Sequence, residues 1–124
     1  MPTKQETFDT VVDHLRTQGQ PSIRDGECAY RGALGRRCAA GVLISDEDYK
    51  PSMEGHSILG TRGEGTACAA VVKAGHDMVL AQDLQAVHDR TESWTGCGLS
   101  DEGEALLRRV AQRHELAYSA PVPQ

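Results

Sequence analysis

Residues 22–44 read SIRDGECAYRGALGRRCAAGVLI, and this stretch carries the turn signals that indicate a small sheet. The dipeptide Asp25-Gly26 is typical of a two-residue hairpin turn, and a second turn is expected over Gly32–Gly35. Short extended segments before, between and after these turns predict a three-stranded antiparallel meander over about residues 22–38.

The chain before this stretch predicts a helix over residues 4–18. Thr3 and Glu6 match the T-x-x-E capping box that begins many helices. Apolar residues then recur with helical spacing and form one stripe, made of Phe8, Val11, Val12 and Leu15. Gly19 ends the pattern, as glycine commonly does at a helix C-terminus.

The chain after this stretch predicts further helices. Residues 38–44 are apolar and rich in alanine, which favours a short helix ending near Ser45. Helices are also predicted for residues 67–73, for residues 77–89 and after the N-cap residue Ser100. The expected fold class is therefore α+β, with an N-terminal helix, a small antiparallel three-stranded meander and then mainly helices.

Three segments are expected to lack regular structure. Glycine and proline are frequent in residues 50–65, which predicts a mobile loop rather than a domain boundary. Residues 91–99 hold Trp94 and two glycines and are also expected to form a loop, and residues 119–124 are expected to fray. Residues 1–124 are expected to form a single domain.

Composition limits the classes of function. The 124 residues include 18 Asp and Glu against 13 Lys and Arg, a formal net charge of −5. This acidic balance argues against non-specific nucleic-acid binding and suits contact with basic protein surfaces. The sequence has no signal-peptide pattern and no apolar run near the roughly 20 residues that a bilayer crossing needs. We expect a cytoplasmic protein that is a monomer or homodimer and does not enter a membrane.

Residues 28–55 follow the pattern C-x-Y-R-G-x-x-G-x-x-C-A-A-G-x-L-I-x-D-E-x-Y-x-P-x-M-E-G. Together with F-D-x-V-V-x-H-L-R at residues 8–16 and D-L-Q-x-V-H-D at residues 83–89, it resembles a group of uncharacterised short proteins of bacteriophages and prophages of proteobacteria. The resemblance covers most of the chain, and residues 55–65 depart from it in being richer in glycine. It implies a small accessory protein of a phage-like element in the cytoplasm of its bacterial host, and it supplies no catalytic residues.

The function expected by analogy with accessory proteins of this size is non-enzymatic: binding a host protein and inhibiting or redirecting it. A defence system such as a CRISPR complex is one target of this kind, which would make the chain an anti-CRISPR protein. Arg and Tyr are frequent in interface hot spots, although a mixed charged surface is also the ordinary state of a soluble protein. The candidate contact residues are Tyr30, Arg31, Arg36, Arg37, Asp46, Glu47, Asp48 and Glu54.

Some of the same residues allow a nucleic-acid-binding module instead. The ring of Tyr30 could stack on a base while Arg31, Arg36 and Arg37 neutralise phosphates. Binding of this kind is expected to fall steeply as salt is added.

A third alternative is a small cysteine-dependent or zinc-binding enzyme centred on Cys38. A thiol at the start of a helix, beside Arg36 and Arg37, is expected to have a lowered pKa, and a histidine from elsewhere could complete a Cys–His pair. The competing interpretation is a buried, unreactive thiol.

Zinc is the only cofactor that the sequence suggests, with Cys28 and Cys38 as ligands alongside a histidine. The predicted meander argues against this pairing, because its register places the two thiols on opposite faces. His88 and Asp89 also look like an acid–base pair, but we interpret His88 as a helix histidine that bonds a neighbouring loop.

Overall fold

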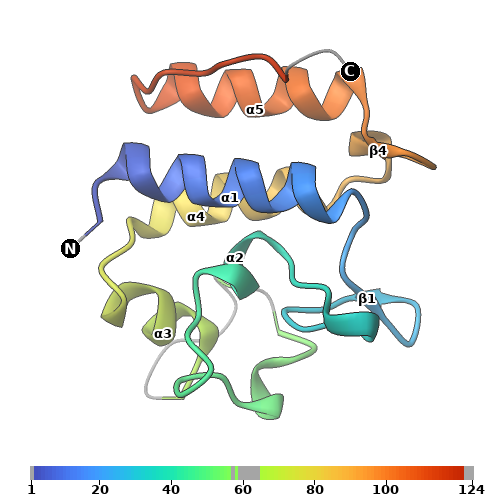
Figure 1. Cartoon of the computed structure of the whole chain (residues 1–124). Helices are drawn as coiled ribbons and strands as arrows, with labels where there is room; N and C mark the ends of the chain where they lie inside the picture. Colours follow the sequence, from blue (N-terminus) through green and yellow to red (C-terminus); the bar gives the residue numbers. More distant parts are fainter. Residues whose placement is uncertain (1, 57, 59–64, 122–124) are drawn as a thin grey trace.

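The structure is a computed structural model that describes residues 2–56, 58 and 65–121 (Figure 1). Within these residues, helices are combined with two small antiparallel sheets of two strands each, so the predicted mixture of helix and sheet is confirmed. None of the described helices has the length and apolar character that a membrane crossing requires.

Three long helices form what we call the helical layer: α1 (Lys4–Gln18), α4 (Met78–Asp89) and α5 (Asp101–Arg113). Helix α4 contacts both α1 and α5. Two short helices, α2 (Ala39–Val42) and α3 (Ala67–Lys73), contact α4 on the side away from α5 (Figure 1).

The predicted helices are confirmed, together with their caps. The Thr3 hydroxyl accepts a hydrogen bond from the Glu6 N–H at 3.1 Å, and the Glu6 carboxylate accepts one from the Thr3 N–H at 2.9 Å. Gly19 ends α1 in the left-handed conformation, with φ of 68°. The side chains of Asp77 and Ser100 cap α4 and α5 as expected.

The meander prediction is wrong beyond its first hairpin. Strands β1 (Ile23–Arg24) and β2 (Glu27–Cys28) pair around the predicted turn. In the described chain no third strand joins them, because Arg31 and Arg37 form only an isolated bridge around a short 3-10 turn, η1 (Ala33–Gly35).

Side chains form hydrogen bonds with the backbone groups that would otherwise pair with a third strand. The two carboxylate oxygens of Glu54 accept hydrogen bonds from the N–H groups of Tyr30 and Arg31, at 2.9 and 3.0 Å. The Gln18 amide accepts from the Arg37 N–H at 2.7 Å and donates to its carbonyl at 2.9 Å. Because these bonds satisfy the backbone, the segment folds without a longer ladder.

A second hairpin stands where residues 91–99 were expected to form a loop. It follows the 3-10 turn η3 (Thr91–Ser93) and pairs β3 (Trp94–Thr95) with β4 (Gly98–Leu99). The Trp94 indole N–H donates to the carbonyl of His88 at 2.8 Å, which fixes the hairpin against the end of α4. The turn at Gly96-Cys97 has no Asn-Gly or Asp-Gly dipeptide, so the local sequence did not reveal the hairpin.

Two glycines allow the first hairpin to lie directly against its neighbours. A Cβ added at Gly41 would stand 2.1 Å from the carbonyl oxygen of Tyr30, so α2 touches that backbone. A Cβ at Gly32 would stand 2.9 Å from the backbone nitrogen and oxygen of Ile23. Both positions require glycine because of close backbone approach rather than backbone conformation.

The segment predicted as a mobile loop is only partly described. It contains the 3-10 turn η2 (Pro51–Met53), and Met53 and Ile58 are buried in the core, with 3% and 4% of their surfaces exposed. The rest of this prediction, at residues 57 and 59–64, lies outside the described residues, as do residues 122–124 of the predicted tail. Ser119 still contacts α1, since its carbonyl accepts a hydrogen bond from Arg16 at 2.8 Å.

Candidate functional site

A cavity of about 410 Å³ lies beside the last two turns of α4. Its volume is in the range of pockets that bind small molecules. Its walls come from α4, from β2 and the residues after it, and from Ile58, so they combine segments far apart in the sequence. The polar lining includes Cys28, Gln85 and Asp89, and the apolar lining includes Ala29 and the Tyr30 ring.

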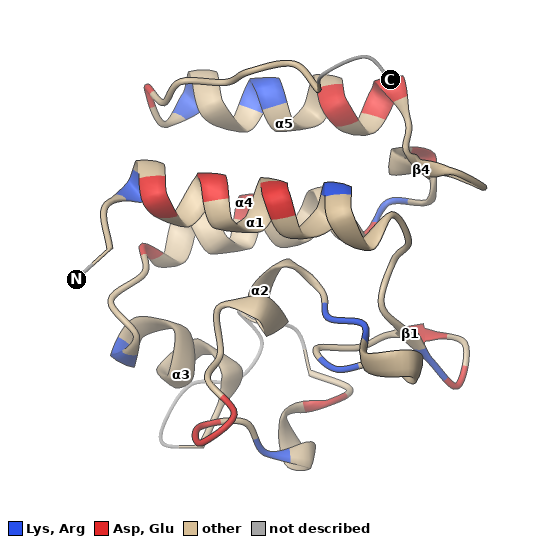
Figure 2. Cartoon of the chain, viewed as in Figure 1, with Lys and Arg blue, Asp and Glu red and all other residues tan. Residues whose placement is uncertain are grey.

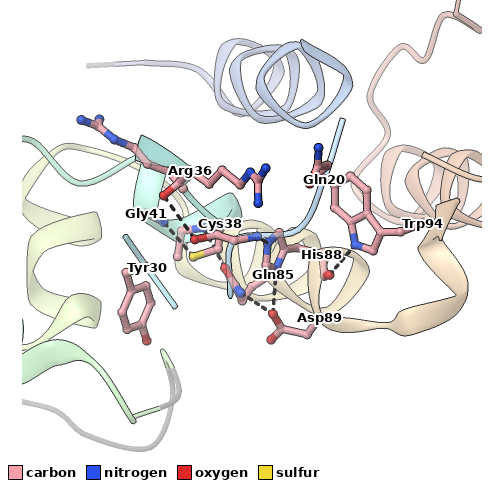
Figure 3. A network of polar contacts seen from close by, with 12 residues as sticks. Gln20, Tyr30, Arg36, Cys38, Gly41, Gln85, His88, Asp89 and Trp94 are labelled. Atoms are coloured by element: carbon pink, nitrogen blue, oxygen red, sulfur yellow. Dashed lines mark hydrogen bonds and ion pairs between the residues drawn. The ribbon is translucent and has the colours of Figure 1, made fainter. Parts of the chain in front are cut away.

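The Asp89 carboxylate is oriented by two neutral groups of α4. Its Oδ1 atom accepts hydrogen bonds from the Gln85 amide at 2.7 Å and from His88 Nδ1 at 2.9 Å (Figure 3). His88 Nε2 accepts from the backbone N–H of Ser22 at 2.8 Å, so the ring proton belongs to Nδ1 and the imidazole is neutral. The interpretation of His88 as a helix histidine that bonds a neighbouring loop is confirmed, but the side chain is fully buried rather than half-buried.

The thiol of Cys28 is held in its neutral form. Burial, together with the charge of Asp89 and a hydrogen bond to it, raises the pKa of Cys28 to about 11. At neutral pH the negative charge of this pair therefore resides on the carboxylate.

Cys38 is the N-cap residue of α2, but the expected lowering of its pKa is wrong. The side chain is 1% exposed, and burial raises its pKa to about 12, although hydrogen bonds from the backbone of Gly41 and Ala40 oppose the shift. Its sulfur accepts from the Gly41 N–H at 3.2 Å (Figure 3). The cost of burying a charge outweighs the helix N-terminus here, so Cys38 is a packed thiol rather than a nucleophile.

The predicted pair of zinc ligands does not come together as a ligand group in the described residues. Cys28 instead groups with His88 and Asp89, whose ligand atoms lie within 4.8 Å of one another, while Cys38 caps its helix on the cavity wall. The group fits zinc poorly, because His88 Nδ1 carries a proton and Nε2 is bonded to Ser22. Zinc binding by Cys28 and Cys38 stays a prediction.

Five of the candidate contact residues form one network: Tyr30, Arg31, Arg37, Asp46 and Glu54. Arg31 and Arg37 both pair with the Asp46 carboxylate, at 2.6 and 3.1 Å. The Arg31 guanidinium also lies over the Tyr49 ring, 4.3 Å from its centre, and the Tyr49 hydroxyl donates to Glu54 at 2.7 Å. These charges stabilise the fold locally, and both signs are interspersed around β1 (Figure 2).

Tyr30 does not lie on the surface. It is 6% exposed, and its hydroxyl donates to the carbonyl of His56 at 2.6 Å. Its ring therefore has no free face for a base outside the cavity, which argues against the nucleic-acid module.

The other candidates lie around the same network. Asp48 pairs with Lys73 at 2.8 Å, while Glu47 is exposed and Arg36 is half-buried. Among the described residues the Arg36 guanidinium makes no ion pair, so its charge is free for another molecule.

Sequence reasoning missed the polar lining of the cavity. Gln85 and Asp89 both lie in the D-L-Q-x-V-H-D pattern at residues 83–89, in which the sequence singles out Asp89 only as an acid–base partner of His88. The spacing of Gln85 and Asp89, one helical turn, is the signal that places them on one face. What they face depends on the distant Cys28 and could not be found locally.

Comparison with known proteins gives no match: no protein-family model matches the chain, no curated protein is significantly similar, and no solved structure matches it.

Proposed function

We propose that the protein binds a protein of its host cell and inhibits or redirects it, without a reaction of its own. The observation that carries this proposal is Leu34 in η1. Its side chain is 87% exposed, and its backbone has the left-handed conformation, with φ of 60°.

Both properties of Leu34 are unfavourable in the free protein. The left-handed conformation costs a residue with a Cβ about 1 to 2 kcal/mol, and water solvates a leucine side chain poorly. The conformation is held by the surrounding turn, in which the Gly32 N–H donates to the Arg36 carbonyl at 2.8 Å and the Arg36 N–H donates to Ala33 at 3.2 Å. A strained, exposed apolar residue on a well-held turn is typical of a binding residue.

The surroundings of Leu34 indicate the chemistry of the partner. Arg36 follows two residues later with an unpaired guanidinium in the described structure, and Arg31 and Arg37 share one exposed carboxylate, that of Asp46. A partner surface with a small apolar pocket and an acidic rim would accept Leu34 and Arg36 together. The resemblance to phage and prophage proteins favours a host protein, including one of a defence system such as a CRISPR complex.

The test is photo-crosslinking in cells of the bacterial host. A photoreactive amino acid at position 34 is expected to capture one defined protein, and purified Leu34→Gly is expected to bind that protein at least about tenfold more weakly. Glycine removes the side chain and also suits the left-handed backbone, so the variant should fold at least as well as the parent. Val72→Asn is the matched control, because Val72 is also exposed, at 53%, but lies on α3.

Two results would overturn the proposal. One is a captured protein that binds Leu34→Gly and the parent equally. The other is a reaction catalysed by the purified protein and lost in Cys38→Ser, which would restore the thiol-enzyme alternative.

A further inference from the structure

We propose that the cavity beside α4 binds a small organic cation, an alkylammonium or alkylguanidinium group, with Asp89 as its counter-ion. This inference is independent of the proposed function, because Leu34 and its turn are not part of the cavity wall. Three properties of the wall carry it: the sign of its charges, the orientation of one carboxylate, and the apolar surface behind that carboxylate.

The formal charges of the wall are negative. Its carboxylates belong to Glu27 and Asp89, and no Lys or Arg is among the described residues that line it. Arg90 follows Asp89 in sequence but points elsewhere, since its guanidinium pairs with Glu92 at 3.3 Å. His56 is the one histidine among the described residues that line the cavity. An anion would therefore be repelled from this cavity.

The Asp89 carboxylate is oriented without being neutralised. Gln85 and His88 both donate to Oδ1, and both are uncharged, as the bond from Ser22 to His88 requires. The Oδ2 atom takes part in neither of these two bonds, and the side chain is 44% exposed. Asp89 is also the last residue of α4, where the helix dipole favours a positive charge.

The rest of the wall suits an alkyl chain. Ala29, Ile58 and Ala86 line the cavity with methyl and methylene groups. Tyr30 also lines the cavity, and cations are attracted to the faces of aromatic rings. The neutral thiol of Cys28 completes the wall without adding a charge.

A metal ion is the competing cation, and the hydrogen bonds disfavour it. Coordination through His88 Nδ1 would require the ring proton to move to Nε2, where it would face the N–H of Ser22. An ammonium or guanidinium group needs only an acceptor, which Asp89 supplies without a change of tautomer. An alkylammonium group could come from a free amine or from a lysine side chain, and the experiment distinguishes these sources.

The experiment is a titration of the ¹⁵N-labelled full chain with n-butylammonium, followed by NMR at pH 7 and low salt. We expect saturable shifts at the amides of Cys28, Tyr30 and Asp89, and none from n-butanol, which has the same alkyl chain without the charge. The third probe is a capped lysine, whose amino end is acetylated and whose carboxyl end is amidated, so that the side-chain amine carries its only charge. If it binds as n-butylammonium does, the cavity admits a protein side chain; if only n-butylammonium binds, the ligand is a free amine.

The decisive variant is Asp89→Asn. The asparagine oxygen still accepts from Gln85 and His88, so the fold is kept while the charge is lost, and we expect binding of n-butylammonium to weaken about tenfold. Glu102→Gln, an exposed residue of α5 outside the cavity, removes one charge elsewhere and should leave binding unchanged. The proposal is overturned if n-butanol binds as well as n-butylammonium, if Asp89→Asn and Glu102→Gln behave alike, or if no saturable binding occurs.

Discussion

The helical layer and the chain between Gln20 and Ile58 differ in how they are stabilised. The helical layer packs through apolar stripes, such as that of Phe8 and Leu15, and satisfies its backbone within each helix. The other segment, which we call the irregular layer, has two-residue strands and short turns. Its backbone is bonded by side chains, above all by that of Glu54 within the segment and by that of Gln18 in α1.

This difference gives polar residues opposite meanings in the two regions. Asp9 and Asp13 of α1 are exposed, so their charges contribute little to stability. Figure 2 shows the acidic positions along this helix. In the irregular layer, Glu54 replaces a missing strand, and His88 supplies the acceptor for Ser22. Polar side chains that look like a binding or catalytic set in the sequence are, in this layer, largely part of the scaffold.

The largest expected effect comes from Gly41→Ala. The new methyl group would lie 2.1 Å from the Tyr30 carbonyl oxygen, which is backbone and cannot rotate away. We expect a loss of more than about 3 kcal/mol in the free energy of unfolding, measured by urea denaturation, or no folded protein. Gly96→Ala is the control, since nothing lies within 4 Å of its Cβ position. Equal stability of the two variants would refute the close contact between α2 and Tyr30.

A second prediction concerns the reactivity of the thiols. With the pKa of Cys28 raised from 9.0 to about 11, its thiolate fraction at pH 8 is about a hundredfold lower than that of an unperturbed thiol. Iodoacetamide labelling, followed by mass spectrometry of peptides, should modify Cys97 much faster than Cys28, although both are exposed, and the buried Cys38 only on unfolding. If Cys28 is labelled as fast as Cys97, Asp89 does not keep the Cys28 thiol protonated.

The next effect tests whether Glu54 replaces a strand. In Glu54→Gln an amide NH₂ would face a backbone N–H or the Tyr49 hydroxyl, and we expect the free energy of unfolding to fall by about 2 kcal/mol. Glu47→Gln removes an exposed carboxylate nearby and should change it by less than about 0.5 kcal/mol. If both variants unfold at the same urea concentration, the irregular layer is not held by Glu54.

The smallest expected effect is a pH dependence of the free energy of unfolding, which arises at the contact between α1 and the turn before α4. Burial lowers the pKa of His76, whose Nδ1 lies 2.6 Å from the Thr7 hydroxyl. Between the lowered value and about 6.5 the unfolded chain binds more protons, so stability falls as the pH decreases through that window. We expect a loss below about 1 kcal/mol between pH 7 and pH 5 that is absent in His76→Asn. An unchanged slope in the variant would assign the effect to another group.

The two hairpins show which parts of the fold local turn signals predict and which they do not. Asp25-Gly26 predicted the first, because that dipeptide favours the backbone conformation of a two-residue turn, and Asp25 indeed has a positive φ of 53°. The second lacks such a dipeptide at Gly96-Cys97 and depends on the bond between Trp94 and the end of α4. The prediction of a third strand was wrong because it depends on a distant residue: the Glu54 side chain that bonds the Tyr30 backbone lies 24 residues away.

The sequence by itself determined the helices, their caps and the first turn, because these depend on residues within one or two turns of one another. Only the tertiary structure decided what the polar residues do. It buried Tyr30 and Cys38, which reversed the expected direction of the Cys38 pKa. It also brought Cys28 to Asp89 and formed the cavity between them. Burial and long-range hydrogen bonds are properties of neighbours distant in the chain, and no local pattern contains them.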